Sequence, residues 1–305
     1  QILSLNNKKA ATIGTLGVRS KTLNFDLLNT TIDPIHLGQI LKKLKNHRIE
    51  NVIMEASSHG LDQNRLDGLI FNTGIFTNLS QDHLDYHKNL KNYLDAKLYL
   101  FRNLIKKKGN IITDSKIPEF VKIKKIAKKK FLKINTIEGK NEKLKILTHS
   151  FHNESQILKI KYKGVVKDIK IDLIGKIQIQ NILMALKAAE KSGLNLNKIL
   201  NVLPSLKPIE GRFEKIGMIK NKSKVILDYA HTPDALKTCL LNLKEQFPDK
   251  KIILLFGCGG NRDQNKRSKM GKVADIFSDE IYLTDDNPRF ESSHKIIKDI
   301  RTGIK

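Results

Sequence analysis

The sequence predicts an α/β protein built on a central, mostly parallel sheet with a small antiparallel part, followed by a second α/β domain. Three observations lead to this prediction. Short apolar runs alternate with helical patterns up to about residue 130, residues 143–174 alternate apolar and polar side chains, and a second strand–helix alternation follows residue 213. Strands that alternate with helices form parallel sheets, whereas period-two alternation is typical of antiparallel strands.

The first part contains four strand-like runs, KAATIGT, NVIM, IFNTGIF and NIIT, at residues 9–15, 51–54, 70–76 and 110–113. The helical patterns lie at 35–46, 89–107 and 117–130, and after the alternating segment at 177–192 and 195–203. The second part contains the strand-like runs VILDYA, KIILLFGC and EIYLTD, with helical patterns at 233–245, 267–277 and 293–304. We therefore expect one domain at 1–213 and a Rossmann-like domain at 214–305.

Length and composition exclude several classes of protein. A chain of 305 residues with 40% hydrophobic residues can bury two cores. No apolar stretch approaches the roughly 20 residues that span a bilayer, and the amino end lacks the pattern of a secretory leader. Cys239 and Cys258 are too few for a disulfide framework and suit a reducing compartment. We expect a cytoplasmic protein that does not bind a membrane.

The formal net charge of +25 raises the question of a nucleic-acid partner. Lysines are scattered along the chain, and their densest run, residues 106–133, contains few aromatic residues. Nucleic-acid surfaces commonly interleave aromatic side chains for base stacking. We therefore expect no nucleic-acid partner, and keep a non-catalytic nucleotide- or polynucleotide-binding module as the alternative from another class.

Two polar clusters follow strand-like runs, EASSHGLDQNR at 55–65 and FTNLSQDHLDYH at 76–87. We expect these strands to be parallel neighbours, and because neighbouring parallel strands bring their carboxyl ends together, the two clusters should face one crevice. Glutamate and histidine side chains that converge there from the two clusters would suit a hard divalent cation, Mg²⁺ or Mn²⁺, whereas capping or solvation is the structural alternative. Lys97 lies beside an apolar helical face marked by Leu94, Leu98 and Phe101, where a lysine usually extends to water.

The remaining candidates each allow a structural and a functional interpretation. No phosphate-binding G-x-x-x-x-G-K-[ST] motif occurs, and FGCGGNRDQNKR (256–267) lacks dinucleotide spacing. GRFE contains Arg212, and LDYAHTPDAL contains Asp228 and His231 at a strand end. TDDNPRFE (284–291) is ordinary turn chemistry, but binding sites also collect at the carboxyl ends of strands.

The ordered set of motifs resembles the Mur ligase family, most closely the members that add meso-2,6-diaminopimelate. The resemblance runs from about residue 10 to 305 through TIGTLG, NTTIDP, EASSHGLDQNR, FTNLSQDHLDYH, AK at 96–97, GRFE, DYAHTPD, FGCGGNRDQNKR and DDNPR. It implies a monomeric, ATP- and Mg²⁺-dependent ligase of peptidoglycan synthesis. Its substrates would be UDP-MurNAc-L-Ala-D-Glu and meso-2,6-diaminopimelate, joined through an acyl phosphate; the L-lysine-adding branch is the alternative.

The resemblance also implies roles for individual residues. The positions that match the UDP-MurNAc-dipeptide site are Asn29, Thr30, Thr31, Ser57, Gln63 and Arg65. Those that match the metal site are Glu55, His83 and Lys97, the last as a carbamate and as the catalytic lysine. Those that match nucleotide contacts are Asn181, Arg212 and Asp228. Those that match the diaminopimelate pocket are Arg262, Asp286, Asn287, Pro288 and Arg289.

Within that pocket we expect Arg289 to grip the distal carboxylate of diaminopimelate, which lysine lacks, because a guanidinium binds a carboxylate bidentately. Arg262 would assist, and Pro288 would hold the backbone. The resemblance implies that the family's P-loop would precede Gln1 and that further contacts with diaminopimelate would follow Lys305. We therefore expect residues 1–213 to be an ATP-binding domain without its P-loop and residues 214–305 to be a shortened amino-acid-binding domain. We also expect the 305 residues alone to be inactive. The segment GKIQIQN (175–181) also departs from the family, which usually has Phe-Asn in place of Ile177-Gln178.

Overall fold

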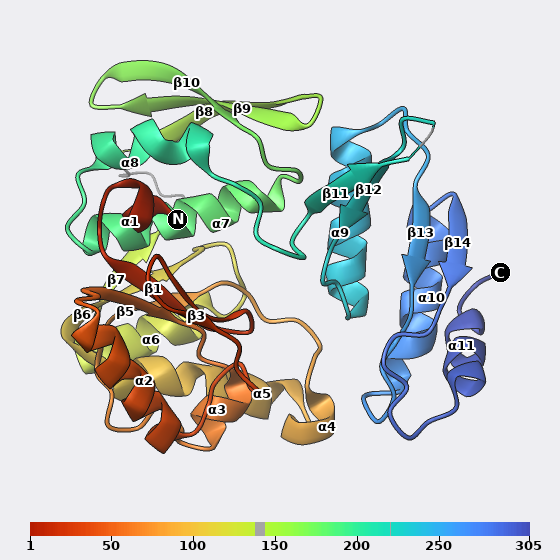
Figure 1. Cartoon of the computed structure of the whole chain (residues 1–305), viewed down its shortest axis with the longest axis horizontal. Coiled ribbons are helices and arrows are strands. Elements are labelled where there is room, and N and C mark those ends of the chain that lie inside the picture. The colour runs from red at the N-terminus through yellow and green to blue at the C-terminus, as the bar shows by residue number, and fades with distance from the viewer. Residues whose placement is uncertain (138–143, 220) are drawn as a thin grey trace. The chain divides into compact units, whose positions relative to one another are not determined.

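The computed structural model describes residues 1–137, 144–219 and 221–305, and its helices and strands form a mixed α/β arrangement (Figure 1). The predicted α/β class is confirmed. Contacts group the chain into two compact units, each assembled from segments that are distant in sequence. Unit 1 consists of Gln1–Leu79, Lys91–Lys143 and Asn181–Leu203, and unit 2 of Ser80–Leu90, Leu144–Gln180 and Pro204–Lys305. The domain boundary at residue 213 stays a prediction.

The first sheet of unit 1 has the strand order β3-β2-β1-β4. Its strands are β1 (Ala10–Gly14), β2 (Gly17–Ser20), β3 (Asn24–Phe25) and β4 (Asn51–Met54). β1 runs parallel to β4 and antiparallel to β2. Helix α2 (Pro34–Asn46) follows because Asp33 caps it through the backbone N–H groups of Ile35 and His36, and Pro34 occupies its first position. The core between helix and sheet contains Ile13, Val18, Leu37, Ile40 and Leu44.

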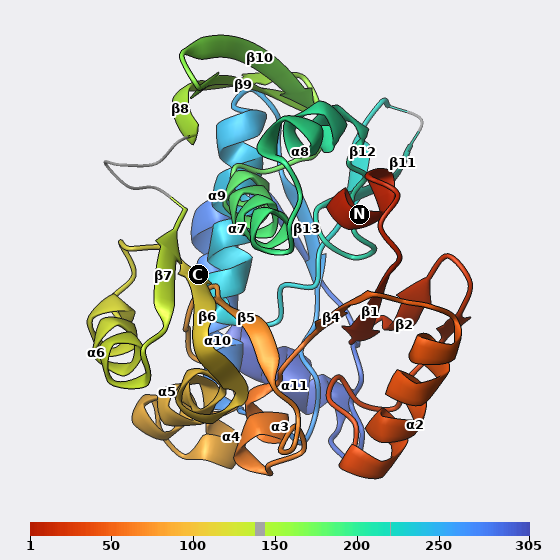
Figure 2. The same ribbon diagram turned by 90° about the vertical axis from the view of Figure 1, so that its left-hand side faces the viewer.

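The second sheet of unit 1 is parallel, in the order β5-β6-β7 (Figure 2). Its strands are β5 (Phe71–Phe76), β6 (Ile105–Thr113) and β7 (Lys133–Thr136), with α5 (Leu90–Tyr99) and α6 (Phe120–Lys130) between them. Leu94, Leu98 and Phe101 are at most 6% exposed, which confirms the predicted apolar face. The helix predicted to reach residue 107 instead changes to a π-helix at Leu100–Leu104, and β6 begins at Ile105.

One prediction about this unit is wrong. β4 and β5 were expected to be neighbours, but β4 hydrogen-bonds to β1 and β5 hydrogen-bonds to β6, in different sheets. The physical reason is that β1 and β6 supply long-range parallel partners, which local apolar patterns do not specify. The shorter elements of the amino-terminal half are α1 (Ile2–Leu5), α3 (Ser58–Asp62) and α4 (Leu84–His87).

Between the two parts of the chain, helix α7 (Ile177–Lys191) begins in unit 2 and continues into unit 1. It is followed by α8 (Leu196–Val202) and the 3₁₀ turn Leu203–Ser205. Asn195 caps α8 by accepting from the backbone N–H of Asn197. Both helices were predicted from their apolar periodicity.

Unit 2 contains the predicted antiparallel segment as a three-stranded sheet, β10-β9-β8. Its strands are β8 (Leu144–His152), β9 (Ser155–Tyr162) and β10 (Val165–Ile171). The buried amide of Gln246 ties this segment to α9, because its Oε1 accepts from Gly175 N at 2.7 Å and its Nε2 donates to Asn153 O at 3.0 Å. The segment therefore belongs with the carboxyl-terminal part of the chain in this structure.

The carboxyl-terminal part of unit 2 has two strand pairs. β11 (Glu214–Met218) and β12 (Lys224–Leu227) are antiparallel, and β13 (Ile253–Phe256) and β14 (Glu280–Leu283) are parallel. The helices are α9 (Pro233–Gln246), α10 (Asn265–Phe277) and α11 (Ser293–Arg301). The predicted strands and helices are present, but β12 pairs with β11, a strand that the sequence pattern did not reveal.

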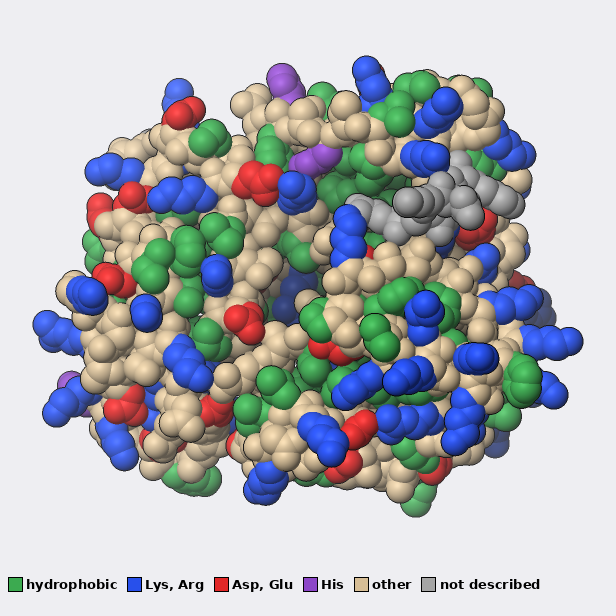
Figure 3. Space-filling view, turned by 180° about the vertical axis from the view of Figure 1, so that it is seen from behind, with side chains coloured by type: hydrophobic (Ala, Val, Ile, Leu, Met, Phe, Trp, Pro, Cys, Tyr) green, Lys and Arg blue, Asp and Glu red, His purple; other side chains and the backbone are tan. Residues whose placement is uncertain are grey.

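Two surface features bear on the predicted partners. No helix within the described ranges has the length and apolar character needed to cross a membrane. On the face drawn in Figure 3, lysine and arginine side chains are spread among acidic, polar and hydrophobic ones. The positive charge on this face is therefore distributed over its surface.

Candidate functional site

The first polar cluster forms around Glu55, directly after β4. The backbone N–H and the Oγ1 of Thr15, after β1, both donate to Glu55 Oε2, at 3.2 and 2.7 Å. Thr15 Oγ1 also lies 3.0 Å from Thr30 Oγ1. A Cβ added to Gly14 would lie 2.5 Å from Glu55 Cδ, so the glycine of TIGT leaves the room that this carboxylate occupies. The motifs TIGTLG, NTT and EASSHG therefore meet at one place in unit 1.

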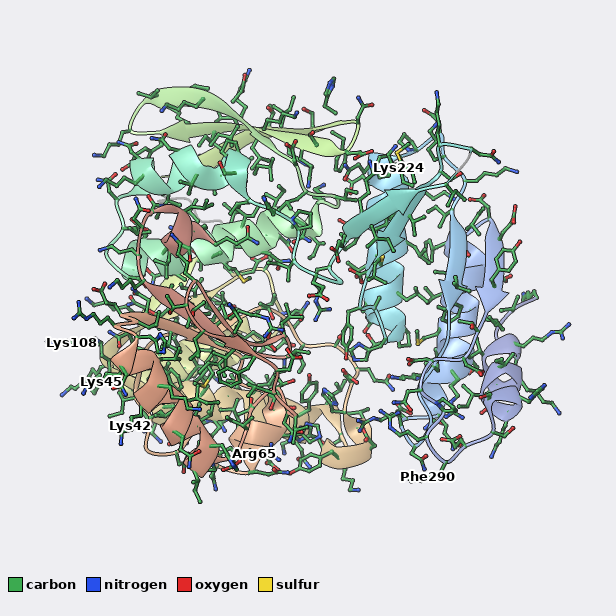
Figure 4. The ribbon with its side chains drawn as sticks, viewed as in Figure 1. Lys42, Lys45, Arg65, Lys108, Lys224 and Phe290 are labelled. Atoms are coloured by element: carbon green, nitrogen blue, oxygen red, sulfur yellow. The ribbon has the colours of Figure 1, made fainter. Side chains whose placement is uncertain are left out.

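Thr31 organises the neighbouring residues and is only 3% exposed. Its Oγ1 donates to Glu55 O at 2.9 Å and accepts from Ser57 N at 3.0 Å. Arg65, which is labelled in Figure 4, donates to Thr31 O at 2.7 Å and also binds the side chain of Gln63. The structure thus brings together Thr30, Thr31, Ser57, Gln63 and Arg65, and leaves Asn29 exposed on the same loop as Thr30.

Ser57 also shapes the start of α3. Its Oγ accepts from Gly60 N at 3.1 Å, which satisfies a backbone donor at the helix start. A Cβ on Gly60 would lie 2.5 Å from Thr31 Cγ2, so this close approach requires glycine. Here Ser57 acts as a helix cap, so any contact of its hydroxyl with a substrate would be added to a structural role.

Lys97 lies on α5 within unit 1. Its Nζ donates to Asn78 O at 3.3 Å and lies 5.7 and 5.2 Å from the ring centres of Phe76 and Tyr93. Aromatic faces and a backbone carbonyl favour a cationic amine. The unmodified amine is therefore accommodated beside the apolar face that the sequence predicted, and the carbamate stays a prediction.

His83 directly precedes helix α4 and has a left-handed backbone conformation, with φ of 54°. Asp82 contacts it twice: Oδ1 accepts from His83 N at 2.8 Å, and Oδ2 lies 3.4 Å from His83 Nε2. A carboxylate beside the imidazole is the common arrangement around a metal-binding histidine. The chemistry of Glu55, His83 and a carbamate on Lys97 fits a hard cation such as Mg²⁺.

The metal assignment nevertheless stays a prediction, because Glu55 and Lys97 belong to unit 1 and His83 to unit 2. In the part of the chain that the structure describes, no group of three or more His, Cys, Asp or Glu side chains is arranged to hold a metal ion. A carbamate on Lys97 would be an oxygen ligand in addition to these four residue types.

Asp82 also binds His231, which joins two motifs within unit 2. His231 Nε2 lies 3.0 Å from Asp82 Oδ2, and Nδ1 lies 3.0 Å from Tyr229 O. Both partners are acceptors, so the doubly protonated ring satisfies both. The hydrogen bond to Asp82 accordingly raises the pKa of His231. Burial alone would raise the pKa of Asp82, but the hydrogen bond from His231 and the nearby imidazole charges lower it to about 2.

The predicted nucleotide residues Arg212 and Asp228 lie close together in unit 2. Asp228 accepts from the backbone N–H groups of Phe213 and Ala230, each at 3.0 Å. Burial raises the pKa of Asp228, although these bonds and the Arg212 charge oppose the shift. The Arg212 guanidinium stacks 4.8 Å from the centre of the Tyr229 ring. Asn181 is exposed on α7 and belongs to unit 1, so its part in a shared site stays a prediction.

The residues predicted to bind diaminopimelate lie on two loops, 257–264 after β13 and 284–291 after β14, which together make up the predicted amine-substrate pocket. Gly260 N donates to Asn287 O at 2.8 Å, and Arg289 Nη1 donates to Gly260 O at 2.8 Å. A Cβ on Gly260 would lie 1.9 Å from Pro288 O, so only glycine allows the loops to approach this closely. The motifs FGCGGNRD and DDNPR, each a weak functional signal when considered alone, are therefore joined in one pair of hydrogen-bonded loops.

Other predicted members of this pocket lie on the same two loops. The Oδ2 of Asp286 would lie 3.7 Å from a Cβ on Gly259, which places this carboxylate against the first loop. Arg262 Nη1 lies 3.8 Å from Asp85 Oδ2, at the segment that contains His83. Gln81 of that segment also donates to Asp263 at 3.4 Å. Residues 80–90 are thus attached to the first loop by polar contacts within unit 2.

Sequence reasoning missed three residues that organise these sites. Thr15 holds the Glu55 carboxylate, and Arg267 and Glu291 join the two loops. A signal for Arg267 was available, since it shares a helical face with the small or apolar residues Met270, Gly271 and Ala274. A charged residue on a buried face requires an ionic partner.

Comparisons with known protein families match nearly the whole chain. Residues 1–189 match the family described as Mur ligase middle domain, and residues 211–305 match the one described as Mur ligase, glutamate ligase domain. Similar curated proteins come from Rickettsia bellii (39% identity, 100% of this chain and 64% of the relative), Zymomonas mobilis (36%, 99% and 62%) and Agrobacterium fabrum (36%, 98% and 61%). All three are named UDP-N-acetylmuramoyl-L-alanyl-D-glutamate–2,6-diaminopimelate ligase.

Solved structures are also similar. A structure with the same ligase name has a TM-score of 0.70 at 30% identity and covers 100% of this chain and 62% of its own. MurF from Acinetobacter baumannii (TM-score 0.72, 17% identity, 100% and 63% coverage) and a folylpolyglutamate synthase from Mycobacterium tuberculosis (0.75, 13%, 99% and 75%) share the fold. The chain thus spans somewhat less than two thirds of the length of the curated relatives it matches.

Proposed function

The chain belongs to the Mur ligase family, and from this premise we propose that it provides the central and carboxyl-terminal parts of a meso-2,6-diaminopimelate-adding ligase. The proposed reaction joins an amine of diaminopimelate to the D-Glu side chain of UDP-MurNAc-L-Ala-D-Glu, at the expense of ATP. The domain division at residue 213 is part of this proposal. Identities of 36–39% to relatives with this name over almost the whole chain support it.

The observation that carries the proposal is the pairing of the loops 257–264 and 284–291. Arg289 is exposed, yet its Nη1 is held at 2.8 Å by Gly260 O. A guanidinium fixed in this way retains N–H donors for a substrate carboxylate. Bidentate binding of that carboxylate favours a substrate that carries it over one that has a hydrogen atom at the same position. Diaminopimelate carries a distal carboxylate and lysine does not, so this arrangement favours diaminopimelate.

We propose that the residues gathered around Thr31 bind the nucleotide-linked dipeptide. Thr31, Ser57, Gln63 and Arg65 are already connected by hydrogen bonds, and Thr30 joins them through Thr15 and Glu55. Side chains held by one another lose less conformational freedom on binding. The hydrogen bonds also restrain Arg65, the only cation of this group, where it can approach an anionic substrate.

The proposed chemistry has two steps. First, the γ-phosphoryl group of ATP passes to the side-chain carboxylate of D-Glu, forming an acyl phosphate and ADP. The amine of diaminopimelate then attacks the acyl carbon, and the tetrahedral intermediate expels phosphate to leave the amide. Arg212, stacked on Tyr229, and Asp228 would contribute to nucleotide binding from unit 2. A Mg²⁺ ion, if held by Glu55, His83 and the carbamate of Lys97, would neutralise negative charge on the phosphoryl oxygens.

Ligation by a purified protein that contains this chain tests the proposal. UDP-MurNAc-L-Ala-D-Glu, ATP and Mg²⁺ are supplied with either meso-diaminopimelate or L-lysine, and product mass and phosphate release are measured. We expect a tripeptide product with diaminopimelate and little with lysine. A preference for lysine would assign the chain to the lysine-adding branch, and no product together with DNA binding that weakens steeply with salt would favour the binding-module alternative.

A further inference from the structure

Arg267 is a buried charge at the start of α10. Its side chain has no exposed surface, and it shares a helical face with Met270 and Ala274. A guanidinium in such surroundings is stable only when carboxylates compensate its charge. Two do: Glu291 at 2.9 Å and Asp299 at 2.9 Å from the same Nη1 atom. Glu291 receives a second bond from Nη2, also at 2.9 Å, which makes this pair bidentate.

Glu291 extends this pair into both loops of the amine-substrate pocket. It is the last residue of loop 284–291, and its carboxylate accepts from the backbone N–H of Asn261 and, at 3.4 Å, from Gln264 Nε2 in the first loop. Arg267 reaches that loop directly, since its Nη2 donates to Gly259 O at 3.4 Å. The hydrogen bonds from Arg267 and Asn261 lower the pKa of Glu291 to about 2.

The same contacts set the register of residues 287–291. Phe290 N donates to Asn261 Oδ1 at 3.1 Å, so the backbone directly before Glu291 is also tied to the first loop. Phe290 is 97% exposed and points away from the protein, whereas the Glu291 side chain is only 13% exposed (Figure 4). A shift by one residue would place the aromatic ring against Arg267 and the carboxylate in solvent. The buried guanidinium therefore favours one register, which also sets where Arg289 meets Gly260.

We propose that Arg267 and Glu291 are positioning residues for the choice of amine substrate. The buried pair holds the two loops together so that Arg289 and Arg262 face the substrate, and neither member of the pair touches the substrate itself. This inference rests on the proposed function for the identity of the ligand. Its structural part, that Glu291 determines the geometry of both loops, is independent of that identity.

Asp299 provides a matched control. It binds the same Nη1 atom of Arg267 at the same distance as Glu291, but it lies on α11, outside the two loops. Glu291→Gln and Asp299→Asn each remove one negative charge from the guanidinium while keeping side-chain size. A purely structural role for the network predicts similar effects of the two changes.

The experiment uses a purified protein that contains this chain. It measures meso-diaminopimelate binding by titration calorimetry, together with the melting temperature and the amide hydrogen exchange of Asn261 and Phe290. We expect Glu291→Gln to weaken binding by tenfold or more and to accelerate exchange at both amides. Asp299→Asn should stay within about threefold of the unmodified chain, with a comparable loss of melting temperature.

Equal losses of affinity and equal exchange in the two variants would overturn the proposal, as would unchanged binding and exchange in Glu291→Gln. If the unmodified protein that contains this chain fails to bind diaminopimelate, the proposed ligand is wrong. Exchange then still decides the positioning role: selective acceleration in Glu291→Gln supports it, and equal exchange in both variants refutes it.

Discussion

Replacing Arg289 with alanine should weaken the binding of diaminopimelate far more than the binding of lysine. The side chain donates to Gly260 O at 2.8 Å and lies on the loop that follows β14. Its φ of 52° is in the left-handed region, but alanine and arginine both carry a Cβ. The change therefore removes the guanidinium without adding backbone strain.

The expected magnitude follows from the exposure of Arg289. Truncating one partner of a buried, hydrogen-bonded charge pair typically costs about 2–5 kcal/mol. Arg289 is exposed before binding, so the lower end applies, about 2 kcal/mol or about thirtyfold in affinity for meso-diaminopimelate. Lysine offers no distal carboxylate, so its weak binding should change by less than about threefold.

Competition calorimetry with both amines measures these affinities, and initial rates of ligation provide a second readout. Arg301→Ala is the control, because Arg301 is also an exposed arginine of unit 2 and ends α11. It should leave both affinities unchanged. Parallel losses for diaminopimelate and lysine, with a lowered melting temperature, would show that DDNPR is a strand-ending turn and would refute the carboxylate clamp.

Three further changes test other parts of the structure. Lys97→Ala should abolish ligation without rescue by bicarbonate, as measured by phosphate release; near-normal activity would show that no carbamate is needed. Gly260→Ala should lower stability by about 1–3 kcal/mol in denaturant titration, because its Cβ would overlap Pro288 O, and an unchanged midpoint would contradict the close approach of the loops. The hydrogen bond to Asp82 raises the pKa of His231 above its ordinary value of 6.5. The stabilisation of the fold by this hydrogen bond is therefore complete below pH 6.5 and is lost as the pH rises through the higher pKa of the folded state. His231→Gln should remove that part of the pH dependence of the melting temperature, and an identical profile in both proteins would exclude it.

The local patterns of the sequence determined most of the elements. The run NVIM predicted β4 at its observed limits, because a short apolar run between polar residues has few other stable conformations. Asp33-Pro34 and Thr232-Pro233 mark the starts of α2 and α9 for a similar reason, since cap and proline act within one turn. Motif order also indicated which loops carry chemistry, and the structure connects the members of two of these groups by hydrogen bonds.

Only the tertiary structure decided how distant segments combine. It placed β4 and β5 in different sheets, paired β12 with the unrecognised β11, and attached residues 80–90 to the carboxyl-terminal segment through Asp82 and His231. It also revealed that Arg267 and Glu291, 24 positions apart, form one buried ion pair. Strand pairing and charge burial depend on partners brought together by packing of the whole chain, and local periodicity carries no information about which partner will be near.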